Sequence, residues 1–178
     1  SEGLSMKNDE ELKAQLIADG LSERVADAAL ELEATMQRWR RRAIQRKPER
    51  QAIEVLNLDL DVPQLDVLTA IRAPLVEFGP DAGQETMVAT VAQRLAIDPS
   101  RASRMISDLI EAGYVSRDVS QSDARRTIVV LSERGEQVVS QVRALKIRLV
   151  GEFLSDWDAK DIETFAPLLA RFSEWSGK

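Results

Sequence analysis

An aspartate–proline pair and a glycine bracket one short stretch, and they constrain the fold more than any other feature of the chain. Asp98 is a residue type that caps helix N-termini, and Pro99 has its φ angle preset for a first helical position. Gly113 is the residue type that ends a helix in the left-handed conformation. We therefore expect a helix from Pro99 to about Ala112. Helical spacing predicts that its buried residues are Ala102, Met105, Ile106 and Leu109.

The segments on either side of this helix complete an order of elements. Before it, Thr86 is the expected cap of a short helix, and Ile97-Asp98-Pro99 is the turn between the two helices. After it, a strand from Tyr114 to Arg117, a polar tip from Asp118 to Arg126 and a strand from Thr127 to Leu131 predict a β-hairpin. Helix, turn, helix and hairpin in this order are typical of a winged helix-turn-helix domain.

Longer helices are expected towards both ends of the chain. One begins after Ser22, and Lys47-Pro48 either ends it or stands just beyond its end, because proline disfavours the α conformation of the residue before it. The next helix should begin near Asp61 and Pro63, and later helices are expected to be capped by Ser132 and Asp158. Pro74 should bend or end the first of these, and Pro167 should kink the last. A loop is indicated by Gly79, Pro80 and Gly83.

Two residue types are missing from the chain, which contains no cysteine and no histidine. Their absence excludes disulfides, zinc fingers and catalysis that depends on a histidine or cysteine. The spacing of the carboxylates suggests no hard-metal site, so we expect no enzyme activity, no metal site and no cofactor. No apolar run approaches the ~20 residues of a membrane span, and we expect a soluble, cytoplasmic protein with no membrane partner.

Charge is distributed unevenly along the chain, whose net charge is −6. The acidic residues gather at the two ends, and a basic run extends from Arg38 to Arg50. This run either offsets the dipole at the C-terminus of a helix or binds phosphate or an acidic ligand. Trp39 lies on an apolar stripe, where core or dimer packing is expected. Stacking on a small ligand is the alternative, which makes Trp39 the candidate ligand-binding residue.

The outward face of the predicted helix 99–112 is small, polar and basic. Its residues are Pro99, Ser100, Arg101, Ser103, Arg104 and Ser107. Such a face suits the major groove of DNA, because arginine can bind guanine in a bidentate contact and a helix N-terminus attracts phosphate. A solvated helix face without a partner is the alternative interpretation.

The predicted hairpin carries two adjacent arginines near its tip. Arg125 and Arg126 could enter a narrow minor groove or pair with phosphates, and Asp123 could hold an arginine by a charge-assisted bond. The alternative is that Asp123 begins a turn and the arginines are solvated.

These motifs resemble those of the MarR (multiple-antibiotic-resistance) family of regulators. Leu60 to Leu68 is similar to the family's second-helix opening, and Asp98 to Arg104 followed by Gly113-Tyr114-Val115 is similar to its recognition helix and exit. The most specific match is the wing, Asp123 to Arg126, with the following Val130 to Gly135. The family's oxidation-sensing branch needs a cysteine, which this chain lacks.

The resemblance covers residues 21–174 and implies a function and an assembly. It implies a ligand-responsive transcriptional repressor that binds double-stranded DNA as a homodimer, often until a small-molecule effector binds. Arg125 would be the minor-groove arginine and Asp123 the residue that orients it. A winged helix dimer that binds a protein partner and no DNA is the alternative.

The predicted fold is mainly α with a small β-hairpin. We expect an N-terminal tail over residues 1–20, in which the residues before Met6 are vector-derived or a processed start. An N-terminal dimerisation helix should occupy 21–60, the winged helix-turn-helix DNA-binding domain 61–131, and C-terminal dimerisation helices 132–178. The terminal helices have more apolar surface than a small winged helix domain covers, which favours burial against a second chain.

Overall fold

The computed structural model describes residues 2–73 and 84–175. The chain divides into two compact units, Ser1–Lys47 and Pro48–Lys178. The loop expected around Gly79, Pro80 and Gly83, and the stop expected at Pro74, lie outside the described residues.

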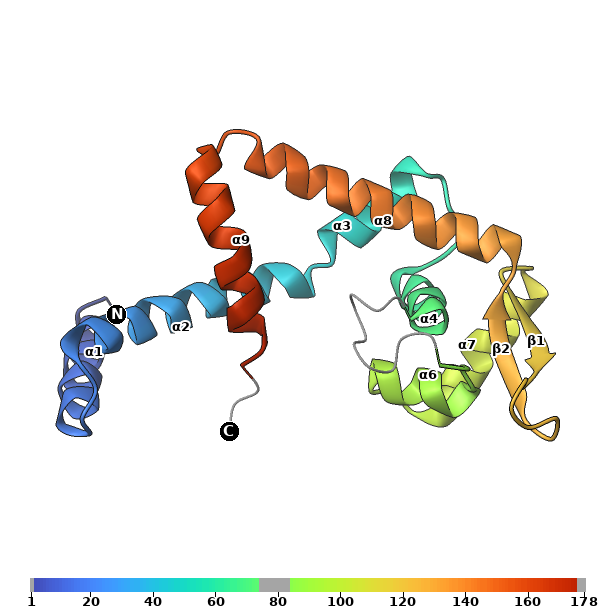
Figure 1. Ribbon diagram of the computed structural model, residues 1–178, viewed down its shortest axis with the longest axis horizontal. Helices are drawn as coiled ribbons and strands as arrows, with labels where there is room; N and C mark the ends of the chain where they lie inside the picture. Colours follow the sequence, from blue (N-terminus) through green and yellow to red (C-terminus); the bar gives the residue numbers. More distant parts are fainter. Residues whose placement is uncertain (1, 74–83, 176–178) are drawn as a thin grey trace. The chain divides into compact units, whose positions relative to one another are not determined.

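The first unit is a pair of helices, α1 (Glu2–Ala18) and α2 (Glu23–Ile44) (Figure 1). The expected tail over residues 1–20 therefore contains a helix, because the stretch between Gly3 and Gly20 holds no proline or glycine. Ion pairs link the two helices: the ammonium group of Lys13 on α1 lies 3.0 Å from a Glu23 oxygen and 2.7 Å from an Asp27 oxygen on α2. Ser22 caps α2 as expected, since its hydroxyl accepts a hydrogen bond from the N–H of Val25.

The second unit begins with α3 (Lys47–Val55), a helix that the sequence pattern did not predict. Helix α2 ends at Ile44, so Lys47-Pro48 stands just beyond its end as expected, and the same pair begins α3. Proline is tolerated in a first turn, where its missing N–H would have no partner within the helix. The break before it falls at Arg46, which has a left-handed φ of 50°.

The next helix, α4 (Val62–Arg72), opens at Asp61 as expected. Asp61 and Gln64 form a capping box, in which each side chain accepts a hydrogen bond from the other residue's backbone N–H, at 2.8 and 2.9 Å. The helix ends at Ala73, which is in the left-handed conformation.

The helix-turn-helix consists of α6 (Val88–Leu95) and α7 (Pro99–Glu111), joined by a tight turn. Asp98 caps α7, and Gly113 beyond its end has a φ of 82°, both as expected. Thr86 is not the cap of α6: the N-cap is Met87, whose N–H donates to the Thr90 hydroxyl at 3.1 Å. Thr86 is instead buried, with hydrogen bonds to the core.

The wing is an antiparallel hairpin of β1 (Val115–Val119) and β2 (Thr127–Leu131). Val115 lies opposite Leu131 and Val119 opposite Thr127. The first strand begins one residue later and ends two residues later than predicted, so the loop between the strands covers residues 120–126. The N–H of Val129 also donates to the carbonyl of Thr86 at 2.8 Å, which attaches the hairpin to the segment before α6.

The chain then forms α8 (Glu133–Leu154) and α9 (Ala159–Ser173), capped by Ser132 and Asp158 as expected. Pro167 lies inside α9, which continues on both sides of it. Rings at the turn between the helices contact one another: the Trp157 ring centroid lies 5.8 Å from that of Phe153 and 5.3 Å from that of Phe165.

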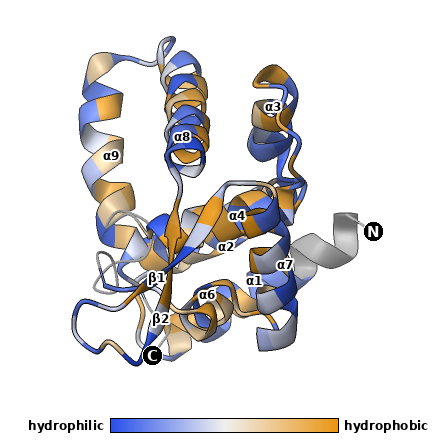
Figure 2. Cartoon of the chain, turned by 90° about the vertical axis from the view of Figure 1, so that its right-hand side faces the viewer, coloured by the Kyte–Doolittle hydropathy of each residue, from blue (hydrophilic) through white to orange (hydrophobic). Residues whose placement is uncertain are grey.

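The core of the second unit lies where α4, α7, the hairpin and the first half of α8 meet. Figure 2 shows the strongly hydrophobic colouring of α4, which contributes the most buried residues. The largest fully buried side chains are Leu65, Leu68, Ile106, Leu109, Val67 and Val91. The mainly helical winged helix fold expected from the sequence is confirmed.

The far ends of α8 and α9 remain apolar and exposed. No residue of α9 is buried. The exposed large apolar residues of these two helices are Ile147, Val150, Phe153, Phe165, Leu168, Leu169 and Phe172. Within the described part of the chain, none of the helices combines the length and the hydropathy needed to cross a membrane.

Candidate nucleic-acid interface

Helix α7 divides cleanly into a buried and an exposed side. Ala102, Ile106 and Leu109 are fully buried. The six residues that the sequence placed on the outward face are all exposed: Pro99, Ser100, Arg101, Ser103, Arg104 and Ser107. The structure therefore brings two guanidinium groups and three hydroxyls together on one helical surface.

The N-terminus of α7 offers backbone donors at the same surface. The Asp98 carboxylate accepts a hydrogen bond from the N–H of Ser100 at 3.4 Å, and Pro99 has no N–H. The partial positive charge of a helix N-terminus attracts anions such as phosphate, so the exposed arginines, the hydroxyls and this helix end share one face.

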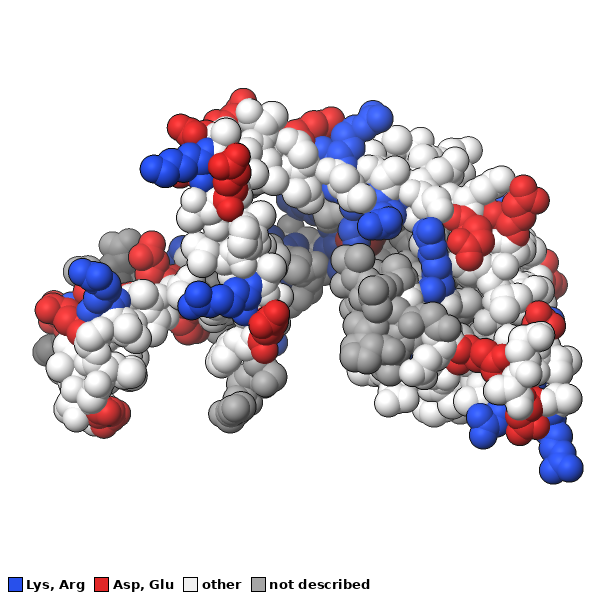
Figure 3. Space-filling view, viewed as in Figure 1, with Lys and Arg blue, Asp and Glu red and all other residues white. Residues whose placement is uncertain are grey.

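The wing tip presents a second group of basic side chains. Arg125 and Arg126 are both exposed, and basic side chains surround an acidic one at the lower right of Figure 3, where Figure 1 shows the hairpin loop. Asp123 belongs to the same loop. One of its oxygens accepts the backbone N–H of Arg125 at 3.0 Å, and the other lies 3.5 Å from Nε of Arg126.

This geometry differs from the role that the resemblance implied for Asp123. We expected its carboxylate to orient the side chain of Arg125. In the structure its ion pair is with the side chain of Arg126, and it contacts Arg125 only through the backbone. The difference arises because the loop turns at Asp123, whose carbonyl accepts a hydrogen bond from the N–H of Arg126 at 2.9 Å. This turn brings Arg126, and not Arg125, over the Asp123 carboxylate.

Glu85 is a site residue that the sequence pattern did not reveal. Its carboxylate accepts the hydroxyl of Ser120 and, at 2.6 Å, the backbone N–H of Gln121, both at the base of the wing loop. The Ser120 hydroxyl and then the Gln121 N–H hold the pKa of Glu85 below its ordinary value, because both hydrogen bonds favour the ionised carboxylate. No local pattern signals this contact, since Glu85 and Ser120 are 35 residues apart.

Thr86, which follows Glu85 in the sequence, is bonded to the core. The Thr86 hydroxyl lies 3.4 Å from the carbonyl oxygen of Ile71 and accepts a hydrogen bond from Arg94 at 2.8 Å. The same Arg94 nitrogen donates to the carbonyl of Ala70 at 2.8 Å. The segment that carries Glu85 is thus fastened to the end of α4 and to α6.

Comparisons with known proteins agree with this architecture. The family model of the IclR helix-turn-helix domain matches residues 81–119, the part that contains α6, α7 and β1. A solved structure of a MarR family protein from Bacillus stearothermophilus is 20% identical with a TM-score of 0.66, covering 86% of this chain and 96% of that one. The chain has the fold of the MarR family.

Two structures of MepR from S. aureus share the MarR fold with this chain. One is of MepR bound to ethidium bromide, 17% identical with a TM-score of 0.56, covering 75% of this chain and 91% of that one. The other is of a MepR mutant bound to an oligodeoxyribonucleotide, 17% identical with a TM-score of 0.53, covering 79% and 94%. The solved structures similar to this chain thus include a protein–DNA complex.

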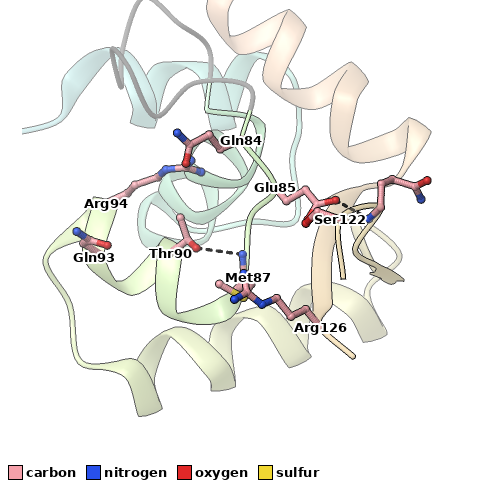
Figure 4. A pocket seen from close by; sticks show the side chains of 9 residues that line it. Gln84, Glu85, Met87, Thr90, Gln93, Arg94, Ser122 and Arg126 are labelled. Atoms are coloured by element: carbon pink, nitrogen blue, oxygen red, sulfur yellow. Dashed lines mark hydrogen bonds between the residues drawn. The ribbon is translucent and has the colours of Figure 1, made fainter. Parts of the chain in front are cut away.

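An open pocket of about 690 Å³ lies between α6 and the wing of this MarR fold. Figure 4 shows Glu85 directed at the wing loop on one side of it and Arg94 on the other. The complete lining is Gln84, Glu85, Met87, Thr90, Gln93, Arg94, Gln121, Ser122 and Arg126. Met87 is the one apolar residue among those that line it, so it differs from the cavities lined mostly by apolar residues that hold drug-sized ligands.

Trp39 and the basic run, the other candidates from the sequence, come before these elements in the sequence. Trp39 is 65% exposed on α2, so it is not a core residue of its unit. Arg41 and Arg42 of the basic run stand in the last turn of α2, where positive charge is favourable to the helix dipole. Near the end of the run, Glu49 on α3 pairs with Lys146 on α8 at 3.2 Å.

Proposed function

We propose that this protein is a sequence-specific DNA-binding transcription regulator that acts as a homodimer on a pseudo-palindromic operator. The observation that carries the proposal is the exposed face of α7, with Arg101 and Arg104 beside three hydroxyls, in a helix-turn-helix that is followed by a wing with two exposed arginines. In this arrangement α7 enters the major groove and the wing reaches the flanking minor groove.

The proposed residue roles follow from position. The exposed side chains of α7 contact base edges or nearby phosphates, and they are those of Ser100, Arg101, Ser103, Arg104 and Ser107. The free N–H groups at the start of α7 hold a phosphate. Arg125 and Arg126 contact the minor groove or its phosphates. Arg125 makes no side-chain ion pair with Asp123, which leaves its guanidinium available to DNA.

The dimer is proposed from the apolar surface of the terminal helices. Seven large apolar side chains on α8 and α9 are exposed in the single chain. Exposed apolar surface on this scale favours an interface in soluble proteins. A two-fold dimer places two copies of α7 on successive major-groove faces, which matches half-sites about 10 base pairs apart. We propose a second copy of the chain as the partner.

We further propose that a small ligand relieves repression. The support comes from MepR, a protein of the same fold whose structure is solved bound to ethidium bromide. Trp39, exposed on α2, is the proposed aromatic contact in this chain. Phenolic compounds are suitable first candidates, because their planar rings stack on an indole.

Selection of bound sequences from random duplex DNA, using the full chain, tests the proposal. We expect enrichment of a two-fold symmetric site, and release of that site by an effective ligand. Arg101→Ala combined with Arg104→Ala should abolish the enrichment, whereas Arg24→Ala with the exposed Arg171→Ala removes the same charge from other helices and should retain it. If the wild-type chain enriches no sequence at low salt, DNA recognition is wrong and a protein-binding winged helix takes its place.

Sedimentation measures the assembly separately. At micromolar concentration the chain of 19.9 kDa should sediment with about twice that mass. Replacing Val150 and Phe153 by serine should return it to the monomer. A wild-type monomer at these concentrations would contradict the two-half-site arrangement.

A further inference from the structure

A carboxylate from outside the hairpin meets the wing loop at its base. Glu85 precedes α6, yet each of its two oxygens contacts the loop over residues 120–126: one accepts the N–H of Gln121 at 2.6 Å and the other accepts the Ser120 hydroxyl. The hydroxyl of Ser122 lies 3.4 Å from the second oxygen. Three consecutive loop residues therefore converge on one side chain, which Figure 4 shows beside Ser122.

The hydrogen bonds of the Ser120 hydroxyl favour Glu85 as the acceptor of its proton. The Ser120 hydroxyl accepts the backbone N–H groups of Ser122 and Asp123, both at 3.1 Å, which occupies its two acceptor positions. Its single proton is then left for an acceptor, and the Glu85 carboxylate is both charged and closer to it than the Ser122 hydroxyl, which lies 2.9 Å away. Because Ser120 is only 5% exposed, water is poorly placed to substitute for that carboxylate oxygen. An ionised carboxylate satisfies both facing donors, and a neutral amide of the same shape satisfies only one.

The wing loop is attached through Glu85 to a rigid part of the domain. Glu85 is followed directly by the buried Thr86, which is bonded to Arg94 and lies against the end of α4. The carbonyl of Thr86 also accepts the N–H of Val129 on β2. The β2 contact fixes the strands, and the Glu85 contact fixes the loop beyond them, where the arginines are.

We propose that Glu85 is a positioning residue that holds the wing loop 120–126 against the helical body and so sets where Arg125 and Arg126 meet DNA. The first half of this inference concerns the free protein, and the second half rests on the proposed function. Without the carboxylate, the loop stays tethered at its two strand ends but its tip moves relative to α7. The spacing between the groove-reading helix and the wing arginines is then no longer fixed.

Hydrogen exchange in the full chain, free of DNA, tests the first half. In Glu85→Gln we expect the Gln121, Ser122 and Asp123 amides to exchange about tenfold faster than in the wild type, because a charge-assisted acceptor is removed. Amides of β1 and β2 should change little. Glu54→Gln, at an exposed position on α3, removes the same charge and should leave the loop amides unchanged. Ser120→Ala provides a second variant that removes the opposite partner, and its readout is the Gln121 amide, which bonds to Glu85 and should exchange faster as in Glu85→Gln. The Ser122 and Asp123 amides are not used in this variant, because they bond directly to the Ser120 hydroxyl.

A double-mutant cycle on the selected DNA site tests the second half. Glu85→Gln should weaken binding about tenfold in the wild-type background, and have little effect once Arg125 and Arg126 are both alanine. A purely structural role would cost the same affinity in both backgrounds. A general charge effect would have the opposite sign, because removing a negative charge favours binding to DNA.

The outcomes separate the two ideas. Unchanged exchange of the loop amides in Glu85→Gln, with the Gln121 amide also unchanged in Ser120→Ala, would overturn the role of Glu85, whatever the DNA result. Faster loop exchange with additive affinities would overturn its link to the wing arginines. If the wild-type chain binds no DNA, the proposed function fails, while the exchange data still decide whether Glu85 holds the loop.

Discussion

Gly135, in the first turn of α8, packs so closely on the carbonyl oxygen of Tyr114 that a Cβ at this position would overlap it. The N–H of Ser132 donates to the same carbonyl at 3.0 Å, and the Ser132 hydroxyl donates to the carbonyl of Gly113 at 2.7 Å. The guanidinium of Arg134 lies 4.2 Å from the centre of the Tyr114 ring. The start of α8 is therefore fastened to the backbone between α7 and the wing.

Gly135→Ala is expected to lower the free energy of unfolding by about 1–3 kcal/mol, because the added methyl group must displace backbone atoms. Gly151 supplies the control in the same helix, since a Cβ there meets nothing within 4 Å in the chain. Gly151→Ala should raise stability by about 0.5–1 kcal/mol through helix propensity. Denaturant unfolding measures both, and a similar change in the two variants would contradict the close packing of Gly135.

The turn of the helix-turn-helix contains a strained residue. Ala96 has a φ of 52°, and its N–H bonds back to the last turn of α6. This conformation costs an L-residue about 1–2 kcal/mol, and glycine avoids the cost while losing about 0.5–1 kcal/mol of chain entropy. Ala96→Gly should thus stabilise the protein by about 0.5–1 kcal/mol. Ala89→Gly, at an exposed position of α6, should destabilise it by a similar amount, and thermal unfolding distinguishes the two signs.

Local signals made much of this fold predictable. An N-cap is decided by one side chain and the three N–H groups after it, so Ser22, Asp98, Ser132 and Asp158 were assigned correctly. The exposed face of α7 followed from spacing alone, because a helix with a few strongly apolar positions has one stable orientation on a core.

Contacts between distant segments were not predictable in the same way. Thr86 has the residue type of a cap, but its hydroxyl serves a buried network with Arg94 and the end of α4. The Glu85 contact depends on how the segment before α6 lies against the wing, which no short motif encodes. The pairing of Asp123 with Arg126 depends on the turn geometry of the loop, and sequence spacing alone left either arginine open.

The position of Arg104 on the exposed face of α7 predicts a role in base choice. Arg104→Ala should relax the preference at one base pair in each half-site, at a cost of about 1–3 kcal/mol for each bidentate arginine–guanine pair that the substitution removes. Affinities for the selected site and for its single-base variants measure this. A uniform decrease in affinity on all sequences would make Arg104 a phosphate-binding residue.

Phosphate neutralisation by the α7 face and the wing predicts a strong response to salt. Affinity should fall steeply between about 50 and 200 mM salt, because each neutralised phosphate releases counterions. The slope of log affinity against log salt concentration, measured by fluorescence anisotropy, should be reduced by about one for each phosphate-binding residue replaced by alanine. A flat response would mean that the complex does not depend on phosphate neutralisation.

The wing loop allows the two adjacent arginines to be told apart. The Asp123 carboxylate pairs with Arg126 and contacts Arg125 only at its backbone. Arg125→Ala should therefore weaken binding and flatten the preference for A·T base pairs beside each half-site, where a narrow minor groove concentrates negative potential. Asp123→Asn should act mainly through Arg126, so its effect should persist in the Arg125→Ala background and disappear in the Arg126→Ala background.

Melting temperatures should stay close to the wild-type value, because these side chains are on a solvated loop. Affinities on operators with A·T or G·C flanks provide the measurement. Full affinity of Arg125→Ala on both operators would remove the wing from the DNA interface, and an Asp123 effect that vanishes with Arg125 instead would restore the pairing first expected from the sequence.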